Sequence, residues 1–171
     1  MVDDLLDLSR MEAGRIELNR HAASPAILIK GAAETHRTLA EEQGIQLRTV
    51  LPTNDQEVFA DPERIAIVLA NLVSNALRHT QAGGQITITA RPKNDRVRFE
   101  VTDTGVGIPQ EYQSRVFDKF FRVPGAPGGA AGLGLSIVKE IVEEHNGEIG
   151  LDSKEGEGST FWFTLPCTTT N

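Results

Sequence analysis

The stretch Asp61-Pro-Glu-Arg-Ile-Ala-Ile-Val-Leu-Ala-Asn-Leu-Val-Ser-Asn-Ala-Leu-Arg-His-Thr80 predicts an amphipathic helix with a well-marked start. Asp61-Pro62 gives that start, because aspartate is favoured as an N-cap and proline at the first helical position. Apolar residues then recur at spacings of three and four, the period of one buried helix face. This apolar face comprises Ile65, Val68, Leu69, Leu72 and Ala76.

A polar stripe borders this apolar face. Asn71 and Asn75 are one turn apart and Arg78 follows three residues later, so the three side chains share one edge of the helix. Asparagine is a poor helix former, but its side-chain oxygen can bind a hard cation such as Mg²⁺, with water and phosphate oxygens completing the coordination. The stripe therefore predicts the wall of a cleft, although two asparagines at this spacing are also common on a solvated helix face.

Two alternating segments downstream predict a hairpin with one buried face. Residues 86–90 and 97–101 alternate apolar and polar side chains, and by period two the next inward position is Asp103. A buried carboxylate needs hydrogen-bond donors, because an unpaired buried ion is strongly destabilising. The amino group of an adenine would be such a donor, and Gly105 and Gly107 would let the backbone approach the base closely. An ordinary Asp-Thr-Gly turn after a strand is the alternative.

Two glycines, Gly132 and Gly134, open a predicted helix that extends to His145. The N–H groups and the positive dipole end at such a start favour a phosphate group. Close packing or a flexible joint would also account for two glycines there. A loop-rich stretch from 104 to 131 precedes this helix and contains an aromatic cluster. The cluster consists of Phe117, Phe120 and Phe121.

The other segments complete an α+β pattern. Residues 1–12 resemble an amphipathic helix, and a further helix runs from Ser24-Pro25 to about residue 43, where Gly44 is typical of a left-handed cap. Further strands are predicted at 15–19, 45–50, 58–60, 148–153 and 159–165. The pattern predicts a two-layer α/β sandwich with a mixed, mostly antiparallel sheet and helices on one face.

Composition limits the function classes. A chain of 171 residues is sufficient for one domain with a short extra element. Its net charge of −7 argues against a general affinity for nucleic acid or anionic lipid. Cys167 is the only cysteine, so an intrachain disulfide is impossible and a reducing cytoplasm fits. The apolar runs are too short to span a membrane and no signal-peptide pattern is present, so a soluble fragment without membrane contact is expected.

Four short blocks together resemble the N, G1, F and G2 boxes of the histidine kinase ATP-binding domain, in the same order and at similar spacing. The blocks are Asn71-Leu-Val-Ser-Asn75-Ala, Asp103-Thr-Gly105-Val-Gly107-Ile, Phe117-Asp-Lys-Phe120-Phe121-Arg122 and Gly132-Leu-Gly134-Leu-Ser-Ile. The resemblance extends from about Leu5 to Pro166 and implies a Bergerat-type ATP-binding fold. It also implies two regions: residues 1–14 as the end of the second helix of a dimerisation and phosphoacceptor domain, and residues 15–171 as the catalytic domain.

The resemblance implies ATP and Mg²⁺ as ligands and assigns roles to individual residues. Asn75 matches the magnesium ligand, Arg78 a phosphate-facing position, Asp103 the residue that reads adenine, and Ser159 a small hydroxyl near the base. The F-box aromatics would tether a lid, with Arg122 near the phosphates. The implied catalytic residues are Asn71, Arg78 and Arg122. The implied nucleotide contacts are Asn75, Arg78, His79, Asp103, Gly105, Gly107, Ile108, Phe117, Lys119, Phe120, Arg122, Gly132, Leu133, Gly134, Leu135 and Ser159.

One departure from the family pattern concerns the lid. The family usually carries another glycine two positions before Gly132, and Ala130 stands there, with Gly128 and Gly129 just upstream. Which lid amides would contact phosphate is therefore left open by the sequence.

The residue at position 71 separates two kinds of ATP user. Gyrase-type topoisomerases, mismatch-repair ATPases and heat-shock chaperones share the fold but have a glutamate there to activate water. An asparagine cannot act as a general base, which favours phosphoryl transfer to a protein over rapid hydrolysis. The family's acceptor is a histidine followed by an acidic residue, with a proline a few residues later. None of the four histidines has this context: His21, His36, His79 and His145.

The resemblance therefore implies the catalytic part of a sensor histidine kinase that transfers the γ-phosphoryl group to a histidine on a phosphoacceptor helix absent from this chain. A response regulator would be the downstream partner, and a monomer or weak dimer is expected. The parent kinase could still be membrane-anchored. A serine-directed kinase of the anti-sigma-factor type and a non-catalytic, nucleotide-gated interaction module are the alternatives. The segment Leu5-Leu-Asp-Leu-Ser-Arg-Met-Glu-Ala-Gly14 resembles the helix junction of histidine kinases and speaks against the first alternative. The intact boxes speak against the second.

Overall fold

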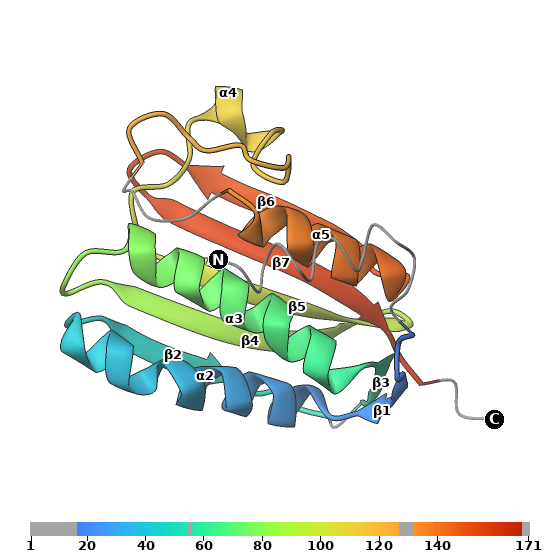
Figure 1. The fold of residues 1–171 in the computed structure, drawn as a ribbon. Helices are drawn as coiled ribbons and strands as arrows, with labels where there is room; N and C mark the ends of the chain where they lie inside the picture. Colours follow the sequence, from blue (N-terminus) through green and yellow to red (C-terminus); the bar gives the residue numbers. More distant parts are fainter. Residues whose placement is uncertain (1–16, 55, 127–131, 169–171) are drawn as a thin grey trace.

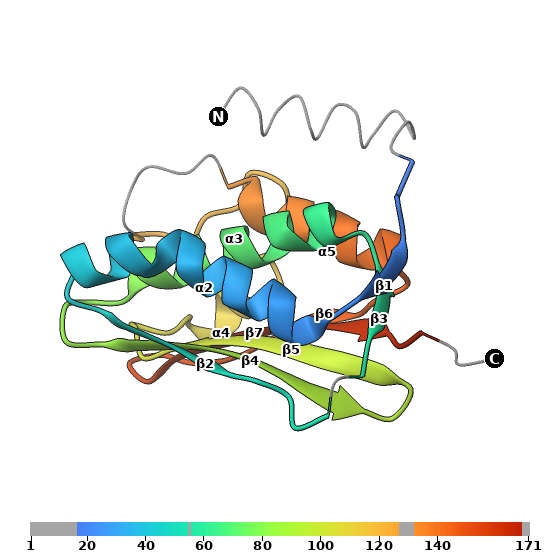
Figure 2. The ribbon, with the colours of Figure 1, turned by 90° about the horizontal axis from the view of Figure 1, so that it is seen from below.

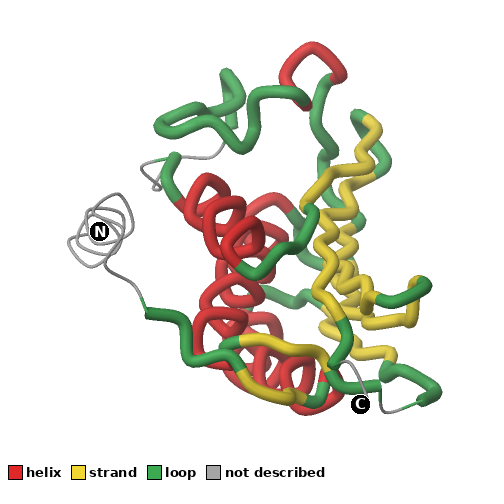
Figure 3. Tube along the Cα trace, turned by 90° about the vertical axis from the view of Figure 1, so that its right-hand side faces the viewer, coloured by secondary structure: helices red, strands yellow, loops and turns green. Residues whose placement is uncertain are grey.

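The protein is a two-layer sandwich of a five-stranded sheet and three helices on one of its faces (Figures 1 and 2). The computed structural model describes residues 17–54, 56–126 and 132–168. Viewed from the side, helices and strands separate into two layers, with the short helix α4 (Gln110–Gln113) beyond one end of the sandwich (Figure 3). The predicted α+β class and the helices on one face are thus confirmed, whereas the helix predicted at 1–12 lies outside the described residues.

The sheet has the strand order β2-β4-β5-β7-β6. Its strands are β2 (Gln46–Val50), β4 (Gln85–Lys93), β5 (Arg96–Asp103), β6 (Ile149–Lys154) and β7 (Gly158–Pro166). Only the edge strand β2 runs parallel to its neighbour, and the other pairings are antiparallel. The sheet is therefore mixed and mostly antiparallel, with β5 at its centre.

Three helices pack on the inner face of this sheet and begin where the sequence predicts. Helix α2 (Pro25–Glu42) follows the N-cap Ser24, α3 (Pro62–His79) follows the N-cap Asp61, and α5 (Gly134–Glu144) ends before His145. Helix α2 lies against β2 and β4, α3 against β4 and β5, and α5 against β6 and β7. Gly44 has a φ of 68°, the left-handed conformation expected after the end of α2.

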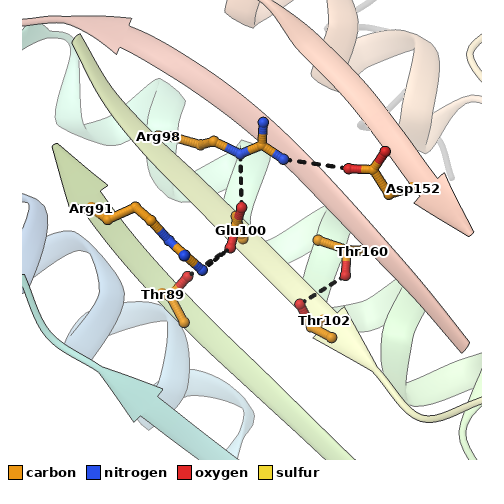
Figure 4. Close-up of polar contacts among 7 residues, drawn as sticks. All are labelled: Thr89, Arg91, Arg98, Glu100, Thr102, Asp152 and Thr160. Carbon is orange, nitrogen blue, oxygen red and sulfur yellow. Dashed lines mark hydrogen bonds and ion pairs between the residues drawn. The ribbon is translucent and has the colours of Figure 1, made fainter. Parts of the chain in front are cut away.

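The outer face of the sheet is polar, because every second side chain of each strand points away from the helices. Arg91 and Arg98 both pair with Glu100, and Arg98 also reaches Asp152 at 3.4 Å on β6 (Figure 4). The Arg98 guanidinium lies 4.3 Å from the ring centroid of Trp162. With these cross-strand pairs, one face of the sheet is polar and solvent-facing, and the other face packs in the core.

A two-stranded ribbon at one end of the sandwich corrects a strand prediction. Residues 17–20 are not in a strand, so the prediction of a strand at 15–19 is wrong; β1 is His21–Ala23 and pairs with β3 (Val58–Ala60). A strand this short forms only where a partner strand lies beside it. Upstream of β1, the backbone N–H of Asn19 donates instead to the Asp61 carboxylate, at 3.0 Å.

Asp61 and His145 join the start of α3 to the end of α5. The Asp61 backbone N–H donates to Nε2 of His145 at 3.0 Å, and Nδ1 of His145 lies 2.7 Å from the carbonyl oxygen of Ile141. A carbonyl only accepts hydrogen bonds, so Nδ1 carries the proton and the ring is neutral. His145 is fully buried, and this burial lowers its pKa, with Arg20 lowering it further; the Ile141 carbonyl, Asp61 and Glu144 oppose the shift.

The buried His145 should make stability fall in acid. A histidine whose pKa is lowered by folding contributes stability above its ordinary pKa of about 6.5, and this contribution is lost as the pH falls through the folded-state value. His145→Gln removes the titration and should cost about 1 kcal/mol at pH 7.5. Thermal unfolding at pH 7.5 and 5.5 should show the difference between wild type and variant shrinking in acid. An equal difference at both pH values would contradict the assignment.

Candidate nucleotide site

One cavity of about 730 Å³ lies between α3, the end of β5, the loop after it, the start of α5 and the segment 121–126. Thirteen of the residues predicted from the sequence line this cavity. They are Asn71, Asn75, Arg78, His79, Asp103, Gly107, Ile108, Arg122, Gly132, Leu133, Gly134, Leu135 and Ser159. Residues from four separate blocks of the sequence thus line one cavity.

Asp103 stands at the end of the central strand with its carboxylate at the cavity. It occupies the inward position that period two predicts, directly opposite Ser159 on β7, and is only 4% exposed. The backbone N–H of Gly105 donates to its Oδ1 at 2.8 Å. Burial raises the pKa of Asp103, and hydrogen bonds from the Gly105 and Ser159 backbones oppose that shift. Any further hydrogen-bond donor that enters the cavity would therefore stabilise the ionised carboxylate.

Helix α3 supplies the polar wall opposite this carboxylate. The Asn71 side-chain nitrogen donates to the Ile67 carbonyl at 2.9 Å, which directs its Oδ1 away from its own helix toward α5. Asn75, Arg78 and His79 continue the wall along α3. Burial and the neighbouring Arg78 lower the pKa of His79, which favours a neutral ring beside the guanidinium.

Two glycines let backbone segments meet where a side chain would not fit. A Cβ on Gly134 would lie 2.7 Å from Oδ1 of Asn71, so the start of α5 can approach the asparagine only without a side chain. A Cβ on Gly107 would overlap the Lys154 carbonyl oxygen, and the φ of Gly107 is 67°. At Gly107 the neighbour is backbone, and at Gly134 it is the Asn71 side chain; the approach of Gly107 to an adenine base that the sequence predicts stays a prediction.

The start of α5 presents backbone N–H groups to the cavity. Its N-cap Leu133 gives no side-chain cap, and the Ser136 hydroxyl donates to the Leu133 carbonyl at 2.8 Å instead of accepting from the first turn. Within the described part of the chain, the first-turn amides of this 11-residue helix therefore have no side-chain acceptor. Such amides and the helix dipole favour an anion at this end.

Four residues predicted as nucleotide contacts do not line the cavity. Gly105 lies behind Asp103, and Phe117 packs edge-on against Phe161, with ring centroids 6.1 Å apart. Lys119 pairs with Glu140 of α5 at 3.3 Å. Phe120 is 64% exposed and has a φ of 63°; its N–H donates to the Gly132 carbonyl at 3.0 Å, which holds Phe120 beside Gly132.

The sequence reasoning missed several cavity residues. Ser74 lies between the two asparagines on α3, and a 100° step per residue could have placed it beside them. Thr80 directly follows His79, and Val106 stands between Gly105 and Gly107, so their neighbours in the sequence could have indicated both. Glu155 and Phe161 come from chain segments whose meeting at this cavity depends on the tertiary fold, and for them no local sequence signal exists.

Comparison with known proteins decides the family. Residues 60–169 match the model of the histidine kinase-, DNA gyrase B-, and HSP90-like ATPases. The chain belongs to this family. The circadian input-output histidine kinase CikA of Thermosynechococcus vestitus is 41% identical over 97% of this chain, and the histidine protein kinase DivJ of Caulobacter vibrioides is 38% identical over 97%. The recognised resemblance to a histidine kinase ATP-binding domain is therefore confirmed, and the two alternative functions are not favoured.

Solved structures agree with the fold of this histidine kinase ATP-binding domain. Full-length ShkA in complex with AMPPNP matches 99% of the chain with a TM-score of 0.89 and 33% identity, over 35% of its own length. The catalytic domain of the histidine kinase ThkA matches 88% with a TM-score of 0.76 and 32% identity, over 96% of its length. This chain spans 24% of CikA and 28% of DivJ. In its described part, no helix combines the length and hydrophobicity that crossing a membrane requires.

The two glycines Gly107 and Gly156 allow backbone strain to be separated from close packing. Both have positive φ, but a Cβ on Gly156 would meet nothing within 4 Å. Gly156→Ala should cost about 1 kcal/mol of stability for its φ alone. Gly107→Ala should cost more, since the Lys154 carbonyl must also move. Denaturant unfolding of the two variants checks this ranking. Equal losses of stability would show that the backbone at Lys154 can move aside at little cost.

Proposed function

We propose that this domain binds Mg-ATP in the cavity described above and transfers the γ-phosphoryl group to a histidine on a phosphoacceptor helix outside the chain. The observation that carries the proposal is that the buried Asp103 carboxylate and the amide stripe of α3 line the same cavity. The complex of ShkA with AMPPNP, an ATP-like nucleotide, supports it by similarity.

Adenine would bind at the sheet end of the cavity. The Asp103 carboxylate would accept a hydrogen bond from the adenine amino group, replacing water lost on burial. Gly107, Ile108 and Ser159 surround the same region, and the apolar side chains of Val106, Leu133 and Phe161 would cover the ring. Guanine has a carbonyl in place of that amino group, so this arrangement selects adenine.

The phosphates would lie between α3 and the start of α5. Mg²⁺, when bound, would offset the negative charge of the phosphates. Asn75 would hold the ion through its side-chain oxygen, with Asn71 beside it, and Arg78 would face the phosphates. The amides at Gly132, Leu133 and Gly134 would receive phosphate oxygens at the positive end of α5. The donor set fits a magnesium polyphosphate, since it combines neutral amide oxygens, one arginine and a helix start.

Segment 121–126 would act as the lid, with Arg122 near the phosphates. The ring of Phe117 would anchor the lid, and the hydrogen bond from Phe120 to Gly132 would tie the start of the lid to the start of α5. Lys119 would steady it through Glu140.

The chemistry proposed is transfer rather than hydrolysis. Asn71 stands where a water-activating carboxylate would be needed, and an amide cannot remove a proton. We also propose residues 1–14 as the end of a phosphoacceptor domain and 15–171 as the catalytic domain, with a response regulator as downstream partner. A cytoplasmic location and a monomer or weak dimer complete the proposal.

Asn75→Ala should weaken Mg-ATP binding about tenfold or more, because it removes the proposed cation ligand. Isothermal calorimetry with and without Mg²⁺ measures the effect, and most of the loss should disappear without the ion. Asn54→Ala, an exposed loop substitution, is the control. If the Asn75 variant and wild type bind Mg-ATP with equal affinity, Asn75 is not a ligand of the metal.

Asp103→Asn should separate stability from recognition. The raised pKa of Asp103 means that its ionised form costs stability at pH 7, so the uncharged amide should raise the melting temperature of the nucleotide-free protein. The same change should weaken ATP binding, while GTP binding stays weak. Differential scanning calorimetry and competition binding give both readouts. Equal weakening of ATP and GTP would show that Asp103 does not select adenine.

Phosphotransfer can be tested in two parts. The chain is incubated with γ-labelled ATP, Mg²⁺ and a separately supplied phosphoacceptor helix pair from a histidine kinase of this family. Acid-labile label on the acceptor histidine, lost when that histidine is replaced, is expected. Nucleotide binding without label on any acceptor would instead support a binding module.

A further inference from the structure

Three chain segments meet at Asp61, at the end of the sandwich away from the cavity. Its carboxylate accepts from Glu63 and Arg64 at 3.1 and 3.2 Å, which caps α3, and from Asn19 at 3.0 Å, just before β1. Its backbone N–H donates to His145 at the end of α5. Asp61 is 6% exposed and His145 fully buried, so water does not compete for the bond between them.

Helices α3 and α5 are antiparallel and touch at both ends. At one end Asp61 binds His145; at the other, Oδ1 of Asn71 lies against Gly134. With a rise of about 1.5 Å per residue, the span from Asp61 to Asn71 is about 15 Å and that from Gly134 to His145 about 16 Å. Because its backbone hydrogen bonds make α5 close to a rigid rod, a shift at its His145 end moves its start beside Asn71 by a similar amount.

We propose that His145 and Asp61 are positioning residues of the nucleotide site, holding the phosphate-binding start of α5 at a fixed distance from Asn71 and Asn75. Through Asn19 the same junction connects the segment that leads into the domain with both helices. A displacement of that segment, transmitted from whatever precedes it, therefore changes the phosphate half of the cavity. This inference rests on the proposed function, since it concerns the same site.

The proposal predicts which half of the nucleotide responds. Asp103 belongs to the sheet and contacts Gly105 and the neighbouring strands β4 and β7, away from the junction, so adenosine binding should not depend on His145. The phosphates, by contrast, would be held between the two helices. A junction variant should therefore weaken Mg-ATP but not adenosine, whereas a general loosening of the domain would weaken both.

His145→Leu is the principal variant, because it leaves the Asp61 N–H without its acceptor and removes the ring hydrogen bond to the Ile141 carbonyl, which keeps only its bond from the backbone N–H of residue 145. Its dissociation constant for Mg-ATP should rise about fivefold or more, and that for adenosine should stay unchanged. His145→Gln carries a side-chain carbonyl that can accept from Asp61, and should restore most of the affinity. Asp61→Asn keeps one oxygen for the helix cap and replaces the other, facing Asn19, with a donor. It leaves the bond from the Asp61 backbone N–H to His145 in place and breaks only the link to Asn19, so Mg-ATP binding should weaken, with little loss of stability, because the entering segment no longer holds the junction. This part of the proposal can be tested even if His145→Leu does not fold.

The control is a core truncation with a similar fall in melting temperature. Ile29 is fully buried on α2, which contributes no residue to the cavity lining. Either Ile29→Val or Ile29→Ala can therefore serve as the control, whichever lowers the melting temperature by the same amount as the junction variant. Calorimetry and NMR titrations are run well below every melting temperature. Unchanged Mg-ATP affinity in His145→Leu and Asp61→Asn, or equal losses for ATP and adenosine, would overturn the inference. Failure of wild type to bind Mg-ATP would instead overturn the proposed function.

Discussion

The buried carboxylate of Asp103 is the constraint around which the site is arranged. It occupies an inward position of the central strand, where the other inward residues of that strand are Val97, Phe99 and Val101. An ion there loses hydration, which is why its pKa is raised, and the Gly105 and Ser159 backbones recover only part of that loss. The free domain thus carries a destabilising group that a donor in the cavity would relieve. Such a group is common at functional sites, where stability is exchanged for recognition.

The surrounding glycines follow from this position. Gly105 must pass close to the Asp103 carboxylate and to the His79 carbonyl, and Gly107 close to the Lys154 carbonyl. A Cβ at either position would push the loop outward and open the base end of the cavity. At the other end, Gly134 permits the approach of α5 to Asn71. At these positions the absence of a side chain matters more than the conformational freedom of glycine.

Sequence alone predicted the parts of this fold that depend on local periodicity. The two N-caps Ser24 and Asp61 set the starts of α2 and α3, and alternation along β5 placed Asp103 on the inner face. Contacts between distant segments were not predictable in this way. The partner of His145 lies 84 residues earlier in the chain, and Lys119 lies beside Glu140 because α5 packs under the F-box loop. Strand β1 was misplaced for the same reason, since its position depends on β3.

The site is divided between a sheet and a pair of helices, and the two parts differ in how they can move. The Asp103 end is fixed by hydrogen-bonded strands on both sides, so its geometry changes only if the sheet changes. The end lined by Asn71 and Gly134 depends on how α5 lies against α3, and helices packed side by side can shift or rotate with little loss of contact. A regulated kinase of this architecture would therefore keep its hold on the adenine constant and alter the alignment of the phosphates. Control of phosphoryl transfer then requires displacement of one helix. The buried junction at Asp61 contacts the preceding segment, so a movement of that segment can cause the displacement.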